Sequence, residues 1–117
     1  MRLPVLIAAL FIAVSALAQE RPLDGAEIRN LLPGIVAVGD GTRQTFEPHG
    51  DTLFDNGGRL SSGRWRIQDD FYCSRWPPGG GWRCYHVLVD DGEPDRLIWV
   101  DAEENGRTIN RILPRER

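Results

Sequence analysis

The residues best suited to chemistry gather in one stretch of the chain, Phe71–Val89. It contains both cysteines, both tyrosines, two of the four tryptophans and one of the two histidines. A thiol can act as a nucleophile, a metal ligand or half of a disulfide, and an imidazole can transfer protons near neutral pH. What these groups do therefore depends on the local fold and on the compartment in which the protein works.

This stretch is predicted to form a β-hairpin with its tip at Pro77–Gly81. The tip prolines cannot donate to a strand ladder, and the three glycines after them can adopt the positive φ values that close a turn. Folding the two arms about their midpoint places Cys73 opposite Cys84 and Tyr72 opposite Tyr85. Opposed Cα atoms lie roughly 4.5 Å apart in a non-hydrogen-bonded pair, which is near the lower limit for a disulfide.

The N-terminus has the pattern of a secretory signal peptide. Arg2 supplies a positive start, Leu3–Leu17 is almost wholly apolar, and Ala16-Leu17-Ala18 matches the small-residue cleavage pattern. The apolar run is shorter than the roughly 20 residues that a membrane-spanning helix needs. We therefore expect a signal peptide over residues 1–18, export to the periplasm or the cell exterior, and no membrane span after signal removal. In an oxidising compartment, Cys73 and Cys84 are expected to form a structural disulfide.

The remaining residues, 19–117, are expected to form a single β-rich domain with an uneven charge. Between Arg59 and Arg83, five arginines accompany two acids, whereas seven acids accompany one arginine between Asp90 and Glu104. The basic segment suits an anionic partner, or its arginines are simply the solvent-facing residues of alternating strands. Both interpretations stay open. Because export is expected, nucleic acid is not an expected partner.

Beyond Gly34 the sequence predicts a meander of short antiparallel strands, because Gly-rich turns separate short apolar runs. The expected strands are Ile35–Val38, Gln44–Glu47, Thr52–Asp55, Gly63–Gln68, Phe71–Trp76, Trp82–Val89, Arg96–Asp101 and Arg107–Leu113. Asp24 and Glu27 form a capping-box pattern that predicts one short helix over Leu23–Pro33. The expected fold class is mainly β: a small antiparallel meander or partly closed barrel of about seven or eight short strands with one N-terminal helix.

Strand alternation leaves some faces undecided. In the strand that contains Trp65, apolar and charged residues alternate cleanly and the indole is expected to point inward. In Leu97–Val100 both faces are apolar, and the same holds for the hairpin arms. The pattern therefore predicts these strands without deciding which of their sides packs into the core.

The best candidate for a recognition surface is the hairpin tip. Arg75, Trp76, Trp82 and Arg83 flank the tip, and tryptophan and arginine are typical of binding surfaces. In the predicted register Arg75 lies opposite Trp82. The alternative is therefore that this arginine stacks on the indole and that the tryptophans only close the end of the barrel. The four residues are the candidate contact for a ligand or partner.

Other chemistries have little support in the sequence. The serines lack a G-x-S-x-G context, the Gly-rich tip has no following lysine, and no cysteine and histidine cluster has the spacing of a metal site. We therefore expect no catalytic residue, no metal and no cofactor. The third-ranked alternative is a hydrolase that pairs His86 or His49 with a carboxylate.

Five motifs follow one another in a fixed order. They are the signal peptide, L-x-G-x-E-I-x-x-L-L-x-G at 23–34, P-x-G-x at 48–51, G-x-W-x-I at 63–67, and Cys73…Trp76…Cys84-Tyr85. In this order they resemble a family of small exported bacterial proteins of unknown function, and the resemblance covers most of the mature chain. It implies an exported β-rich domain with no established activity, so no functional residue carries over.

These observations lead us to expect a small exported, non-enzymatic β-domain that binds a small ligand or an envelope or protein partner. The alternative is an inhibitor of a secreted hydrolase, with the disulfide-pinned tip as the loop that enters the enzyme. A cavity lined by aromatic residues would favour ligand binding, and a filled core would favour recognition at the surface.

Overall fold

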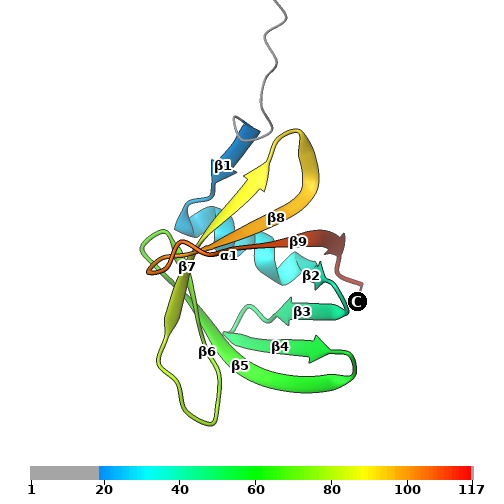
Figure 1. Cartoon of the computed structure of the whole chain (residues 1–117), viewed down its shortest axis with the longest axis vertical. Coiled ribbons are helices and arrows are strands. Elements are labelled where there is room, and N and C mark those ends of the chain that lie inside the picture. The colour runs from blue at the N-terminus through cyan, green and yellow to red at the C-terminus, as the bar shows by residue number, and fades with distance from the viewer. Residues whose placement is uncertain (1–18, 117) are drawn as a thin grey trace, which may run out of the picture.

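The computed structural model describes residues 19–116, which form an antiparallel β-barrel with one short helix (Figure 1). The predicted signal peptide, residues 1–18, lies outside the described residues. The strands are β1 Glu20–Pro22, β2 Ile35–Gly39, β3 Thr42–Phe46, β4 Asp51–Asn56, β5 Arg59–Gln68, β6 Phe71–Arg75, β7 Arg83–Asp90, β8 Glu93–Asp101 and β9 Arg107–Pro114. The helix α1 spans Gly25–Leu31 and continues into a 3₁₀ turn at Leu32–Gly34.

The barrel is fully closed, whereas the sequence predicted an open meander or a partly closed barrel. The strands follow the order β1-β7-β6-β5-β4-β3-β2-β9-β8, and pairing of β7 with β8 closes the ring of β2 to β9. Strand β7 shares its other edge between β6, which pairs with residues 83–85, and β1, which pairs with residues 88–90. The mainly β prediction is confirmed, and all eight expected strands are present. Strand β1 was missed because its three residues are too few to show alternation.

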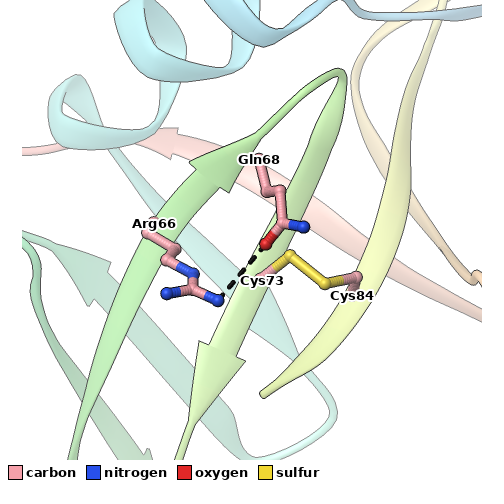
Figure 2. Close-up of a disulfide and its surroundings, with 4 residues drawn as sticks. All are labelled: Arg66, Gln68, Cys73 and Cys84. Atoms are coloured by element: carbon pink, nitrogen blue, oxygen red, sulfur yellow. Dashed lines mark hydrogen bonds between the residues drawn. A yellow bond between two sulfur atoms is a disulfide. The ribbon is translucent and has the colours of Figure 1, made fainter.

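The hairpin has the predicted register, with Tyr72 opposite Tyr85 and Cys73 opposite Cys84. Both tyrosines pack against the core, so the two cysteines face outward. They form the expected disulfide, with Cα atoms 4.0 Å apart. Figure 2 shows the bond on the outer side of the sheet, with the Arg66–Gln68 hydrogen bond of 3.2 Å beside it.

A layer of aromatic rings crosses the middle of the barrel. Phe46 is completely buried, and its ring centroid lies 5.8 Å from that of Tyr72 and 6.0 Å from those of Trp65 and Trp99. These four rings come from β3, β6, β5 and β8, so they connect strands that are distant in sequence. Edge-on and tilted contacts of this kind stabilise by about 0.5–1.5 kcal/mol per pair beyond the burial of area. The layer also shows that Trp99, with Leu97, faces inward.

Helix α1 covers one end of the barrel. Its capping box forms as predicted: the amide of Glu27 donates to the Asp24 carboxylate at 2.8 Å, and the amide of Asp24 donates to the Glu27 carboxylate at 3.1 Å. Ile28 and Leu32 are fully buried and join the core below the aromatic layer. No helix in the described part of the chain is long and apolar enough to cross a membrane.

The first residue of the helix is packed directly on the β5–β6 turn. A Cβ atom on Gly25 would lie 2.4 Å from the carbonyl oxygen of Asp69, so no larger residue fits without movement. The amide of Gly25 also donates to the Asp70 carboxylate at 2.9 Å. These contacts seat the helix at the end of the barrel where β5 turns into β6, and they leave the other end uncovered by it.

We predict that replacing both cysteines in a Cys73→Ala/Cys84→Ala variant leaves the barrel folded but less stable. The bond closes a loop with a sequence separation of 11 residues. Chain entropy for such a loop corresponds to roughly 3 kcal/mol, or a little less, of unfolding free energy. Urea denaturation followed by tryptophan fluorescence measures the loss. A variant that unfolds at the same urea concentration as the wild type, with the same slope, contradicts the prediction.

Candidate ligand site at the barrel mouth

The end of the barrel opposite α1 opens into a cavity of about 420 Å³. Seven of the eight barrel strands line it, at the ends of β2, β4, β6 and β8 and at the starts of β3, β7 and β9. The missing strand is β5, whose Gly63 is covered by the indole of Trp76. A volume of this size falls within the range of roughly 300–1,000 Å³ that is usual for small-molecule sites.

Aromatic rings form most of the walls and floor of this mouth cavity. Tyr72 and Trp99, whose centroids are 4.9 Å apart, form the floor and belong to the aromatic layer. Phe54 meets the indole of Trp76 edge-on at 6.2 Å, and Tyr85 completes the set. Phe54, Trp76 and Tyr85 are only half-buried, so their rings offer apolar surface on which a ring-shaped ligand can lie.

Two side-chain amides hold fixed positions among these rings. The Gln44 amide nitrogen donates to the hydroxyls of Thr52 and Tyr72, at 3.0 and 3.3 Å. The Asn110 carbonyl oxygen accepts from the indole nitrogen of Trp99 at 2.7 Å. Each amide is thereby oriented by the barrel wall, because one of its polar atoms is engaged there.

Other polar groups at the mouth have free hydrogen-bonding positions. Within residues 19–116, the hydroxyls of Thr42 and Thr108 and the carbonyl oxygen of Gln44 make no hydrogen bond to another side chain or to the backbone. They lie on the lining of the cavity. A ligand in the mouth would therefore meet acceptors and donors that the protein itself does not use.

Among the described residues, 19–116, no charged side chain lines the mouth cavity. Its titratable members are phenols, and burial raises the pKa of Tyr72 well above its ordinary value, although hydrogen bonds to Ser74 and Gln44 oppose the shift. Burial also raises the pKa of Tyr85. Both phenols therefore stay neutral at physiological pH. An ionic ligand would lose its hydration in this cavity without gaining an opposite charge.

The indole of Trp76 is held in place by a glycine. A Cβ atom on Gly63 would lie 2.6 Å from the indole carbon Cε3 of Trp76 and 2.7 Å from the carbonyl oxygen of Arg75. The ring therefore lies flat on the β5 backbone. Its nitrogen donates to the Ser74 hydroxyl at 3.2 Å. The glycine of the G-x-W-x-I motif is thus what leaves room for one wall of the cavity.

The pleat of the strands separates the four predicted contact residues. Trp76 lines the mouth, whereas Arg75 and Trp82 lie on the outer face of the hairpin. Arg83 turns away toward the β8–β9 turn, where it pairs with Asp101 at 2.5 Å. The structure therefore brings Trp76 to the cavity, and it brings three of the four residues, Arg75, Trp76 and Trp82, together in a groove outside the barrel.

Within residues 19–116, the arginine that stacks on Trp82 is Arg66 and not Arg75, for which the hairpin register had offered this contact as an alternative. The guanidinium of Arg66 lies over the Trp82 ring, 4.0 Å from its centroid. Arg66 comes from β5, on the same outer face, and is the cross-strand neighbour of Cys73. The sequence register of the hairpin alone could not show this, because the stacking residue belongs to a third strand.

The two histidines lie away from the mouth cavity. His49 contacts the Asp51 carboxylate at 2.9 Å in an exposed turn, and hydrogen bonds from His49 and Arg64 lower the pKa of Asp51. His86 lies on the outer face, where its ring centroid is 4.7 Å from that of Phe71. Among residues 19–116, no three His, Cys, Asp or Glu side chains are grouped to hold a metal ion.

Several cavity residues escaped the sequence analysis because they look like ordinary strand-end polar residues. They are Thr42, Gln44, Thr108 and Asn110. The alternation of side chains along β3 could have identified two of them, because Thr42 and Gln44 lie on the same face of the strand as the buried Phe46. A polar residue in phase with a core residue on the same strand was the signal that could have revealed the site.

Comparisons with known proteins add no further identification. No protein-family model matches the chain, and the searches of curated proteins and of solved structures found no match. The function is therefore argued from the geometry of the site.

We predict that Gly63→Ala displaces Trp76 from its position. The added methyl group overlaps the indole and the β5–β6 backbone, so the variant should lose roughly 1–3 kcal/mol of unfolding free energy and change its near-ultraviolet circular dichroism. Gly79→Ala is the matched control, because a Cβ there meets nothing within 4 Å. An unchanged aromatic spectrum and stability for Gly63→Ala would show that the indole does not lie on this glycine.

We also predict a pH-dependent role for Asp101. Backbone amides of Glu104 and Glu103 and the guanidinium of Arg83 lower the pKa of this carboxyl. The carboxylate therefore stabilises the fold above its unfolded pKa of roughly 4 and loses this effect as the pH falls through the folded value.

Urea denaturation of Asp101→Asn and wild type across pH 2–7 tests this effect. The difference in unfolding free energy should be largest near neutral pH and should shrink at acid pH. A difference that stays constant over this range contradicts the prediction.

Proposed function

We propose that this protein is a small exported binding module that holds an uncharged small molecule in the open mouth of its barrel. The observation that carries the proposal is the mouth cavity of about 420 Å³, which combines aromatic walls with oriented amides and hydroxyls and has no charged lining residue. A cavity lined by aromatic residues, in contrast to a filled core, favours binding of a small ligand over recognition at the surface. The ligand is proposed to enter at the end that α1 leaves uncovered.

The lining defines the chemical class of the ligand. Apolar ring faces such as those of the half-buried Trp76 and Phe54 favour a molecule with a flat apolar side. The free groups of Gln44, Thr42 and Thr108 favour a molecule that also has hydroxyl or amide groups, because a ligand that covers these groups removes them from water and must replace the lost hydrogen bonds. Uncharged saccharides and similar ring compounds have both properties. We take an uncharged monosaccharide or disaccharide as the first class to test.

Export is part of the proposal. The Cys73–Cys84 disulfide supports it, because such bonds persist in oxidising compartments. The predicted signal peptide at 1–18 supports it from the sequence. A non-enzymatic role fits a lining of amides, hydroxyls and phenols that orient a ligand, while His49 and His86 lie elsewhere.

The experiment is a titration of the mature chain with glucose, N-acetylglucosamine and their disaccharides, followed by amide NMR shifts and tryptophan fluorescence. We expect at least one compound to shift resonances of strand ends at the mouth, with the outer face unchanged. Thr108→Val should weaken that binding by about two- to tenfold, because one hydrogen bond to the ligand is lost.

Thr45→Val is the matched control, since this threonine lies on the outward alternation of β3, between the inward Gln44 and Phe46. Its affinity should equal that of the wild type. The proposal is overturned if no compound in the panel shifts the mouth resonances, or if both threonine variants weaken binding equally.

A further inference from the structure

A second hollow, the tip groove, lies outside the barrel between β5 and the tip of the β6–β7 hairpin. It has a volume of about 370 Å³, and its apolar walls are Trp76, Trp82 and the tip residues Pro77–Gly79. Arg64 and Arg75 complete the lining. The groove and the mouth cavity share Trp76 but open on different faces, so they are separate sites with different chemistry.

Positive charge is concentrated at the tip groove by the sheet register. Arg64 of β5 lies directly opposite Arg75 of β6, and Arg66 lies on the same outer face two residues along. Like charges directly opposite each other destabilise a sheet. Such an arrangement costs stability unless a partner of opposite charge offsets it.

The protein itself offsets only part of this charge. Arg64 pairs with Asp51 at 2.5 Å and also reaches the carbonyl oxygen of His49 at 3.4 Å. Arg75, by contrast, makes no ion pair and no side-chain hydrogen bond within residues 19–116, and it is exposed. Its five N–H donors are therefore available beside an apolar wall.

Contacts within the protein already fix the walls of the tip groove in the absence of a ligand. The Trp82 ring is covered on one side by the guanidinium of Arg66 at 4.0 Å. The Trp76 indole lies on Gly63. The disulfide joins the two arms two residues before Arg75 and two residues after Trp82. A site whose walls are already ordered loses less conformational entropy when a ligand binds.

We propose that the tip groove binds an oxyanion, a carboxylate or a phosphate, that is carried on an aromatic or alkyl group. Arg75 is the main charge contact, Arg64 assists from the neighbouring strand, and Trp76 and Trp82 hold the apolar part. Guanidinium groups can donate two parallel N–H bonds to a pair of oxygens, which both a carboxylate and a phosphate present. The site is independent of the mouth cavity and of the saccharide class proposed for it.

The test is a titration of the mature chain with phenyl phosphate, benzoate, inorganic phosphate and uncharged benzyl alcohol, followed by tryptophan fluorescence and amide shifts. We expect phenyl phosphate or benzoate to shift the resonances of residues 75–82, inorganic phosphate to bind more weakly, and benzyl alcohol to leave them unchanged. Comparison of the two aryl anions identifies which oxyanion the groove prefers. Affinity should fall as salt rises, because the charges are partly exposed.

Two arginine variants make the test specific. Arg75→Gln should weaken binding of the aryl anion by about tenfold, which corresponds to the loss of one charge-assisted hydrogen bond. Arg111→Gln is the matched control, because Arg111 is also exposed and also lies opposite an arginine, Arg96, but has no tryptophan wall.

Two outcomes would overturn the proposal. One is that none of the aryl anions shifts residues 75–82. The other is that Arg75→Gln and Arg111→Gln weaken binding equally, which would mean attraction by net charge alone. Removing Arg75 also removes a like-charge pair, so the variant is expected to fold, and its urea midpoint verifies this. Failure here leaves the saccharide titration of the mouth cavity unaffected.

Discussion

The structure depends on the ring of aromatic side chains that crosses the waist of the barrel. Phe46 is completely buried and touches Trp65, Tyr72 and Trp99, so one side chain connects four strands. On one side of this layer the interior is filled by α1 and its apolar residues. On the other side Tyr72 and Trp99 become the floor of a cavity. A small barrel can keep an open mouth because this layer and the helix supply a compact core at the other end.

Because side chains alternate along a strand, one hairpin contributes to both the mouth cavity on its inner face and the tip groove on its outer face. Tyr72, Ser74 and Trp76 of one arm face the interior, while Cys73 and Arg75 face outward. Because the disulfide lies on the outer face, the covalent link takes no space from the cavity (Figure 2). It stiffens the hairpin at the point where both the mouth cavity and the tip groove begin.

The acidic and basic segments of the sequence differ in how their charged side chains are paired in the barrel. In the acidic segment 90–104, buried Asp90 and Asp101 accept hydrogen bonds from backbone amides of the turns that follow them, and Arg83 and Arg96 pair with acids there. Backbone amides and ion pairs therefore stabilise part of the negative charge of that segment. In the basic segment, Arg59, Arg66 and Arg75 have no acidic partner among residues 19–116, and of these Arg66 and Arg75 lie beside Trp82.

The local features of this protein could be predicted from its amino-acid sequence. The capping box at Asp24, the hairpin register at Cys73–Cys84 and the positions of eight strands follow from residue types within a few positions of one another. Tertiary structure alone decided which faces of Leu97–Val100 and of the hairpin turn inward, because both faces were apolar and only closure of β7 on β8 selects one. It also decided that Arg83 leaves the tip, that Arg64 and Arg66 approach it from β5, and that Gln44 and Asn110 meet in one cavity. These contacts join strands that are far apart in sequence, so no local pattern contains them.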